Sequence, residues 1–597
     1  MAKEPYCTRL TALRKLMAKN AIDAYIVVTD DFHASEYAGD YFKCREFLSG
    51  FDGSAGTLVV TAEEAGLWTD GRYFLQAKDQ LEGTGIELRR MGEPGVPTIT
   101  EYLKQALPEN GCVGYDGRTV SAAFAGRIEK ALEEKKAGYR QNVDLVGDIW
   151  TDRPEFPHAP IWLLDSSFTG RTRAEKLKEL RDALKNVGAQ ATIIASLDDI
   201  AWLYNLRGGD VAFNPVAMSY TMVTLNCAVL YISPDAVSDK IAAELEADGV
   251  SLRPYLQVYE DAKALKGSVL LDTNSINVTL LNAVGKDVRR ILTDNPTTLK
   301  KAVKTPTECE NMQIAHIRDG AAVTKTICWL KHLADITEVT ELDVARKLEQ
   351  FRREQPDYLG PSFPSIVAAG AHGAIIHYEP TQKTNVRLEK NSFVLMDTGA
   401  QFMQGTTDIT RTVALGSVSE KQKLHYTAVL RGNLGIAAAV IKHGCTGVHL
   451  DAIARMPLWE LGMDYNHGTG HGVGYLLNVH EGPNHIGLRG RDGGMGTAFA
   501  PGMITSDEPG AYLEGEYGIR LENLVLTVER EKTEYGEFLG FKPLTLVPFD
   551  RDAILPEKLS EQERRTLNAY HERVYETISP YLTQNEAEWL REQTLPL

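Results

Sequence analysis

The alternation of apolar and polar positions follows one pattern twice in the first half of the chain. The pattern occurs at residues 13–16, 24–28 and 30–31, and again at residues 180–184, 191–195 and 198–199. Each copy predicts an amphipathic helix, a short buried strand and an acidic turn, with lengths that differ by one residue. The repetition favours two related α/β domains in tandem.

Two local signals predict the domain boundaries. Prolines at 154, 157 and 160 exclude a helix or a central strand, so residues 150–160 are expected to form a linker. Further on, Thr305, Pro306 and Glu308 have the spacing of a capping box, which begins a long helix. We therefore expect domains at 1–155, 161–303 and 305–597.

Composition and charge narrow the class of protein. The chain of 597 residues is too long for one core, and its 43% hydrophobic content is that of a globular protein. A net charge of −17 argues against nucleic acid or an anionic membrane as a partner. No signal peptide or membrane span is expected. Seven scattered cysteines without a Cys-x-x-Cys pair indicate reduced thiols, and hence a cytoplasmic location.

Two aspartates stand at strand-like runs of the sequence. Residues 393–396 are apolar and end at Asp397, and residues 407–413, which contain Asp408, alternate as in a strand. This pattern predicts a hairpin with the two carboxylates on facing positions. Such carboxylates repel unless a proton or a cation lies between them. Two separate, solvated turn aspartates are the alternative interpretation.

Histidines and glycines alternate at residues 467–474. His467 and His471 have a zinc-like spacing, but glycines at 468, 470 and 472 exclude a helix. In an extended segment both rings can still face one cavity. His480 follows, whereas His485 is interpreted as a structural residue in a loop.

Two glutamates complete a set of candidate ligands. Glu508 stands at the end of a strand-like run, before Pro509 and Gly510. A second strand is predicted from 517 to 526, and its period of two places Arg520 and Glu522 on one face. Arg520 could form a plain ion pair or orient Glu522.

The set of four carboxylates and one imidazole would balance two divalent cations. Oxygen-rich ligation favours manganese-type metals. Two metals about 3.5–4 Å apart are an apparatus for amide hydrolysis.

These motifs resemble those of the pita-bread metallopeptidases. The resemblance rests on the order Asp–Asp–His–Glu–Glu in the segments 396–399, 407–411, 467–472, 507–510 and 520–523. Segments 49–57, 68–74, 198–208, 375–378 and 478–483 extend it over essentially the whole chain, and they resemble the three-domain aminopeptidase P group. The implied fold class is α/β and α+β, with two creatinase-like N-terminal domains before a pita-bread catalytic domain.

The resemblance also implies a role for each residue. Asp397 would bind one metal, His471 and Glu508 the other, and Asp408 and Glu522 would bridge both. His377 and His480 would contact the substrate near the scissile bond, with Glu508 as proton carrier. His467 would line the proline pocket, and Arg72 would reach the peptide. Either Arg489 or Arg491 could lie on the proline side.

The implied activity is removal of the N-terminal residue from peptides with proline in second place, through a hydroxide that bridges two Mn²⁺ ions. We also expect a homodimer, and no nucleic acid or membrane partner. Prolidase is the alternative among enzymes, although it usually lacks the middle domain. A non-catalytic pita-bread binding protein is the alternative from another class, and the intact ligand set argues against it.

Overall fold

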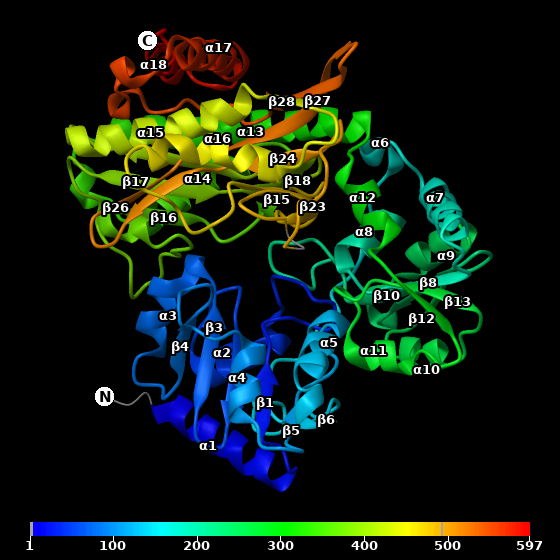
Figure 1. Cartoon of the computed structure of the whole chain (residues 1–597). Helices are drawn as coiled ribbons and strands as arrows, with labels where there is room; N and C mark the ends of the chain where they lie inside the picture. Colours follow the sequence, from blue (N-terminus) through cyan, green and yellow to red (C-terminus); the bar gives the residue numbers. More distant parts are fainter. Residues whose placement is uncertain (1–3, 491–492) are drawn as a thin grey trace. The chain divides into compact units, whose positions relative to one another are not determined.

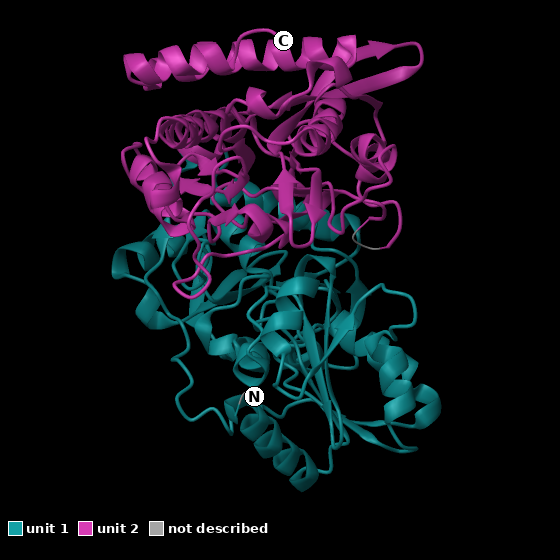
Figure 2. Cartoon of the chain, turned by 90° about the vertical axis from the view of Figure 1, so that its left-hand side faces the viewer, with its two compact units in different colours: residues 1–166, 171–298 teal, residues 167–170, 299–597 magenta. Residues whose placement is uncertain are grey.

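Residues 4–490 and 493–597 are described by a computed structural model, and they divide into two units (Figure 2). The first unit comprises Met1–Ser166 and Arg171–Thr298, and the second comprises Ser167–Gly170 and Leu299–Leu597. Each unit is described by itself below.

The first unit contains two six-stranded sheets with one topology. The strands of the first sheet lie in the order β4-β3-β2-β1-β5-β6, and those of the second in the order β12-β11-β10-β8-β13-β14. Within each sheet the first strand along the chain has an antiparallel neighbour on one side and a parallel neighbour on the other. The strands are β1 (Ala24–Val27), β2 (Thr57–Thr61), β3 (Ala65–Thr69), β4 (Glu87–Arg90), β5 (Cys112–Gly114), β6 (Gly138–Arg140), β8 (Ala191–Ile194), β10 (Ser219–Thr224), β11 (Ala228–Ile232), β12 (Val250–Pro254), β13 (Ser268–Leu271) and β14 (Arg289–Leu292).

The predicted repeat is confirmed by this shared topology. Helices α1 (Glu4–Lys19) and α7 (Arg173–Asn186) each precede the first strand of their sheet. Each helix buries one apolar stripe, which includes Leu10, Leu13 and Met17 in α1 and Leu177, Leu180 and Leu184 in α7. The proline-rich residues 150–160 contain no helix or strand, as their composition predicts.

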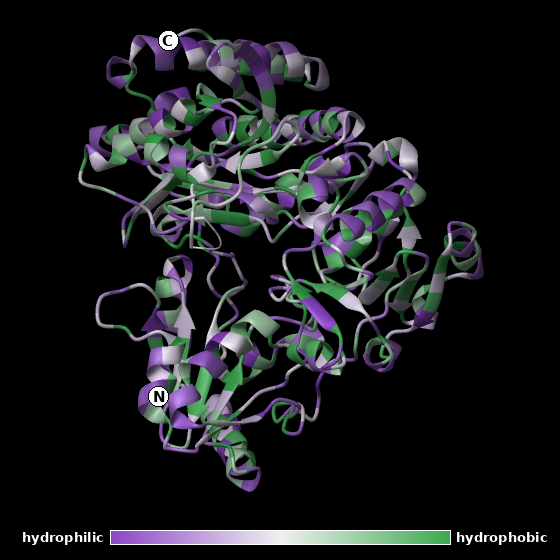
Figure 3. Ribbon diagram, turned by 45° about the vertical axis from the view of Figure 1, so that its right-hand side comes forward, coloured by the Kyte–Doolittle hydropathy of each residue, from purple (hydrophilic) through white to green (hydrophobic). Residues whose placement is uncertain are grey.

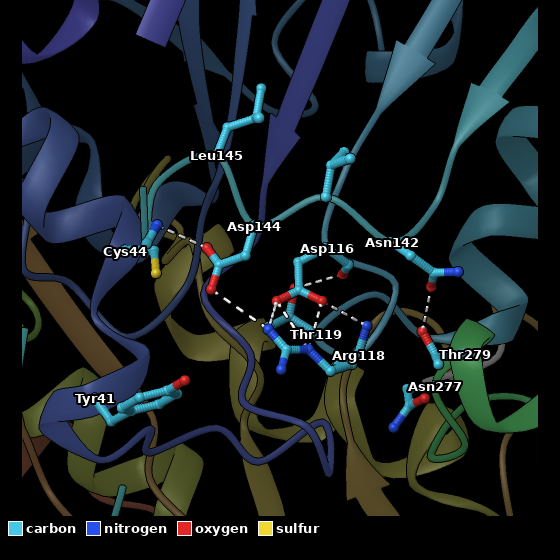
Figure 4. A network of polar contacts seen from close by, with 12 residues as sticks. Tyr41, Cys44, Asp116, Arg118, Thr119, Asn142, Asp144, Leu145, Asn277 and Thr279 are labelled. Atoms are coloured by element: carbon cyan, nitrogen blue, oxygen red, sulfur yellow. Dashed lines mark hydrogen bonds and ion pairs between the residues drawn. The ribbon is translucent and has the colours of Figure 1, made fainter. Parts of the chain in front are cut away.

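A network of polar contacts lies where the two halves of the first unit meet (Figure 4). Within the first half, the guanidinium of Arg118 lies 2.7 Å from Asp116 and 3.4 Å from Asp144. The hydroxyl of Thr279, in α11 (Val278–Ala283), donates to Asn142 over 3.0 Å. The second half is thus anchored to the segment that follows β6.

The second unit is built from long helices and several antiparallel sheets (Figure 1). Thr305 caps α13 (Pro306–Lys331) through the predicted capping box with Glu308. The other helices near the sheets are α14 (Glu341–Arg353), α15 (Glu420–Ala437) and α16 (Gly447–Trp459). Two terminal helices, α17 (Glu561–Ile578) and α18 (Gln584–Gln593), are largely hydrophilic, with purple predominating in Figure 3.

Three sheets of this unit contain or adjoin the candidate metal ligands. Their strand orders are β16-β17-β20, β21-β28-β27-β24-β22-β23 and β25-β26. The strands are β16 (Ile366–Ala369), β17 (Phe393–Thr398), β20 (Ile409–Ala414), β21 (Val440–Lys442), β22 (Gly470–Gly472), β23 (Glu481–Ile486), β24 (Ile504–Asp507), β25 (Gly510–Leu513), β26 (Tyr517–Arg520), β27 (Asn523–Thr533) and β28 (Gly536–Pro543). No helix among the described residues is long and apolar enough to cross a membrane.

Candidate metal centre

Asp397 and Asp408 lie at the same end of an antiparallel pair of strands. Asp397 is the penultimate residue of β17, and Asp408 immediately precedes β20. In the register of this pair, Asp397 lies opposite Thr410, so Asp408 is two residues away from the directly facing position that the sequence predicts. The loop between them is not a simple turn, because it also contains β18 (Ala400–Phe402) and β19 (Gly405–Thr406), which pair with each other.

His471 is held in a segment that is extended, as the glycine pattern predicts. Its backbone N–H donates to the hydroxyl of Ser506 over 2.9 Å. A Cβ at Gly470 would clash with the carbonyl of Ser506, so only glycine allows β22 to approach β24 this closely. The ring Nδ1 lies 3.0 Å from the carbonyl oxygen of Gly472, which makes it the donor and leaves Nε2 as an acceptor.

The Nε2 atom of His471 faces two of the candidate carboxylates. It lies 3.5 Å from Oδ2 of Asp408 and 3.4 Å from Oε1 of Glu508. Glu508 follows β24, and its N–H donates to the carbonyl of Thr469 over 2.8 Å. The side chains from three separate segments therefore converge on one imidazole nitrogen.

Glu522 is fixed against β20 by both backbone and side chain. Its N–H donates to the carbonyl of Thr410 over 3.1 Å, and the hydroxyl of Thr410 donates to its Oε2 over 2.8 Å. One ligand atom from each of Asp408, His471 and Glu522 lies within 4.8 Å of the others, and all three residues are buried. This grouping has the size expected of a metal site.

The electrostatics of the cluster call for a cation. Burial, followed by the charges of Glu522, Asp397 and Glu508, raises the pKa of Asp408 well above its usual value. Burial and the charge of Glu522 likewise raise the pKa of Glu508. Burial and the charge of Asp397 raise the pKa of Glu522 to about 8. Carboxylates so disposed are charged at neutral pH only if positive charge is brought to them.

Two buried oxygen atoms of the cluster are available as metal ligands. Among the described residues, Oδ1 of Asp397 and Oε1 of Glu522 are buried and lack a hydrogen-bond partner. Such groups are costly unless a ligand satisfies them. Four carboxylates and one neutral imidazole fit a pair of divalent cations.

Arg520 has a different partner from the one that the strand period suggests. Its Nη2 lies 2.6 Å from Oδ2 of Asp397 and also donates to the carbonyl of Ile376. The expected strand from 517 to 526 is interrupted, because β26 ends at Arg520 and β27 begins at Asn523. Glu522 therefore does not continue the strand of Arg520, and the Arg520 side chain contacts Asp397 in β17 instead.

The candidate substrate histidines lie around this cluster. The ring of His480 packs edge-on at 4.3 Å from that of His471. Nε2 of His467 hydrogen-bonds to the hydroxyl of Tyr512 over 2.8 Å, and Nη1 of Arg520 donates to that hydroxyl over 2.9 Å. His377, half-buried, follows Ile376, whose carbonyl accepts from Arg520.

Tyr512 was missed by the sequence analysis. It lies on β25 opposite Gly518 and connects His467 to Arg520. Burial raises its pKa to about 12, which keeps the phenol protonated. A tyrosine in a short apolar strand carries no sequence signal that distinguishes it from a core residue.

The remaining candidates are placed as follows. Arg72 follows its cap residue Asp70 in the first unit and forms a two-point ion pair with it, at 2.8 Å for both contacts. His485 lies in β23, opposite His471, and not in the loop that the sequence suggests. Arg489 lies in an irregular segment, and Arg491 lies outside the described residues.

Comparisons with known proteins cover nearly the whole chain. Residues 310–529 match the model of metallopeptidase family M24, and residues 537–597 match the C-terminal region of that peptidase family. Residues 9–153 and 152–308 each match a creatinase/prolidase N-terminal domain. The two N-terminal matches agree with the repeated sheet topology.

Relatives of similar length are Xaa-Pro aminopeptidases. The chain is 40% identical to the probable Xaa-Pro aminopeptidase P of Neurospora crassa, over 98% of this chain and 89% of that protein. It is 37% identical to aminopeptidase P1 of Arabidopsis thaliana, over 98% and 99% of the two chains.

Solved structures show the same likeness. The X-prolyl aminopeptidase of Caenorhabditis elegans, described as a cytosolic enzyme with a dinuclear active site, superimposes with a TM-score of 0.93 at 34% identity, over 99% of this chain and 100% of its own. The Xaa-Pro dipeptidase of Bacillus anthracis gives a TM-score of 0.51 at 25% identity and covers 64% of this chain and 99% of its own.

Proposed function

The chain belongs to metallopeptidase family M24, and on that premise we propose that it is an Xaa-Pro aminopeptidase, which hydrolyses the N-terminal residue from peptides with proline in second place. The observation that carries this proposal is the convergence of Asp408, His471 and Glu522 in a chain that matches such enzymes from end to end. We further propose the domain boundaries 1–155, 161–303 and 305–597.

We propose that the cluster holds two divalent cations, with Mn²⁺ as the metal. Asp397 would bind one ion, His471 and Glu508 the other, and Asp408 and Glu522 would bridge them. The preference for manganese follows from a donor set in which oxygen predominates. When bound, the pair would polarise the scissile carbonyl and supply an activated water.

The surrounding residues would bind the peptide and move its protons. His480, whose ring packs against that of His471, would donate a hydrogen bond to the carbonyl oxygen as negative charge develops there. Glu508 would take up a proton from the attacking water and pass it to the departing proline nitrogen, which has no N–H of its own. His377 would bind near the scissile bond, His467 would line the proline pocket, and Arg72 would contact the peptide.

Prolidase activity is the competing proposal within the family. The Bacillus anthracis dipeptidase covers only 64% of this chain, whereas the long Xaa-Pro aminopeptidases match nearly all of it. The repeated N-terminal sheets therefore favour the aminopeptidase. A binding protein without catalysis is disfavoured because all five candidate ligands are present.

The test is a hydrolysis screen of Xaa-Pro and Xaa-Ala peptides of two to nine residues with the manganese-loaded protein. The proposed pocket would fit the proline ring. An alanine side chain would leave part of the pocket empty, and its backbone N–H would have no acceptor there. We expect the kcat/KM for Arg-Pro-Pro to exceed that for Arg-Ala-Ala by at least tens of fold. Equal cleavage would indicate a broad aminopeptidase, and cleavage of dipeptides alone would indicate prolidase.

We also propose a cytoplasmic homodimer. The Caenorhabditis elegans enzyme is described as cytosolic, and all seven cysteines of this chain are free thiols. Helix α16 exposes a stripe of apolar side chains, namely Ile453, Met456 and Trp459, with Leu461 just beyond it. Such a stripe is typical of an interface. Sedimentation of the wild type and of Met456→Glu would test it, and a wild type that is monomeric at micromolar concentration would disprove it.

A further inference from the structure

A fully buried ion pair lies behind the segments that carry Asp397 and Asp408. Asp319 belongs to α13 and Arg352 to the last turn of α14, and their side chains are 0% and 1% exposed. Nε of Arg352 donates to Oδ1 of Asp319 over 2.7 Å, and Nη2 donates to Oδ2 over 3.0 Å. This two-point geometry fixes the guanidinium plane relative to both helices.

The free arm of Arg352 holds the segment that carries Asp397. Nη1 donates to the hydroxyl of Thr398 over 2.6 Å and to the carbonyl of Gly399 over 2.9 Å. Thr398 directly follows Asp397, so the guanidinium contacts the neighbouring residue and leaves the candidate ligand itself available.

The carboxylate of Asp319 holds the segment that carries Asp408. The hydroxyl of Thr407 donates to its Oδ2 over 2.5 Å, and Thr407 directly precedes Asp408. The same hydroxyl accepts from the N–H of Ala400 over 2.9 Å. One ion pair is therefore bonded to both strand ends from which the two aspartates project.

The chemistry of the pair suits a rigid spacer. A buried, neutralised pair cannot exchange its partners for water without exposing an unpaired charge in the interior, so its contacts are maintained. Arg352 contacts the segment that carries Asp397, and Asp319 contacts the segment that carries Asp408. A change in the separation of Thr398 and Thr407 would break at least one of them.

We propose that Asp319 and Arg352 are positioning residues that set the separation of Asp397 and Asp408, and thereby the affinity of the site for its metal pair. The inference rests on the proposed function. Partners of this kind around metal ligands affect affinity by roughly 10- to 100-fold.

Isosteric and conservative variants separate positioning from simple stability. Thr407→Val and Thr398→Val each remove a hydroxyl that contacts the ion pair and leave the pair itself in place. Arg352→Lys keeps the charge but loses the fork, and Asp319→Asn keeps the shape but loses the charge. Lys331→Met is a matched control, because Lys331 ends the same helix and forms an ion pair with Asp550 at 2.7 Å. Its other partners are Asp552 and the carbonyl of Ala414, at the far end of β20.

The measurement is calorimetric titration of Mn²⁺ into the metal-free full-length protein, together with thermal unfolding in the absence of metal. We expect Thr407→Val and Arg352→Lys to weaken the affinity for Mn²⁺ about 10- to 100-fold. Lys331→Met should lower the unfolding temperature without changing the affinity of the folded protein. Should Arg352→Lys or Asp319→Asn fail to fold, the two valine variants decide the question.

Two results would overturn the inference in different ways. Valine variants that bind Mn²⁺ as the wild type does would show that the ion pair supports only the fold. A wild type that binds no divalent metal would disprove the proposed function and this inference with it.

Discussion

Nη2 of Arg520 lies 2.6 Å from Oδ2 of Asp397, and this contact leaves Oδ1 of Asp397 as a buried atom without a hydrogen-bond partner among the described residues. The guanidinium thus satisfies one oxygen and orients the other as a potential ligand. The positive charge of Arg520 also offsets the repulsion between the carboxylate of Asp397 and the other carboxylates of the cluster.

Replacing Arg520 should therefore weaken metal binding as well as catalysis. Arg520→Lys keeps the charge but loses the contacts to Tyr512 and Ile376. We expect a loss of about 10- to 100-fold in metal affinity, measured by titration of the metal-free protein. Arg565→Lys, at an exposed position on α17, is the control, and an equal loss in both variants would contradict the assignment.

Removing either proposed bridging carboxylate should abolish activity and reduce the metal content. Asp408→Asn and Glu522→Gln preserve the shape of each side chain but lower its affinity for a cation. Elemental analysis should give fewer than two metal ions per chain for each variant. Glu514→Gln, at an exposed position, should keep both ions. Wild-type turnover of Arg-Pro-Pro by Asp408→Asn would disprove the bridging role.

The metal-free protein should lose stability as the pH rises. Burial and the charge of Asp397 raise the pKa of Glu522 to about 8, and burial raises those of Asp408 and Glu508 as well. When the pKa of an acid is higher in the folded protein than in the unfolded protein, the folded protein binds more protons. The acid then stabilises the fold fully at pH values below its pKa in the unfolded protein, and this stabilisation is lost as the pH rises through its pKa in the folded protein.

We therefore expect the unfolding temperature of chelator-treated protein to fall between pH 5 and pH 8, by about a few degrees. Scanning fluorimetry across this range measures the effect. Glu522→Gln should flatten the slope, since an amide does not titrate. A metal-free wild type whose stability is level or rises over this window would contradict the interpretation.

Arg72 should act on substrate and not on metal. Arg72→Ala is expected to lower kcat/KM for a tripeptide, because the proposed peptide contact is lost, while both metal ions remain bound. Steady-state kinetics and elemental analysis on one preparation provide the comparison. Lys104→Ala, exposed on α4 (Ile99–Ala106), should match the wild type. Unchanged kinetics for Arg72→Ala would show that this role is wrong.

The sequence predicted the repeated domains because their signals are local. A helix face, a buried strand and a turn are each determined within about ten residues, and both copies contain all three. The order of the ligand candidates was predicted for the same reason, since each stands beside a recognisable strand or glycine-rich segment.

Relationships between distant segments could not be predicted in this way. The partner of Arg520 depends on a break in the strand at Leu521 and Glu522, which an unbroken period of two conceals. Asp397 pairs with Thr410, and the loop between the two aspartates contains two short strands that the local pattern does not indicate. Asp319 and Arg352 lie on separate helices, and a single charged residue on a helix normally indicates a solvated face.

The hydrogen bond from Nδ1 of His471 to the carbonyl oxygen of Gly472 fixes the tautomer of this imidazole through the main chain alone. Ligating histidines donate the second ring N–H to a carboxylate, a backbone carbonyl or water, and where the partner is a side chain its substitution can alter the ring. Here every amino acid at position 472 would offer the same carbonyl, although crowding excludes all but glycine. The tautomer of His471 is thus set by the course of the backbone. Substitutions of the side chains around His471 could change its surroundings, but they would not change which ring nitrogen faces the carboxylates.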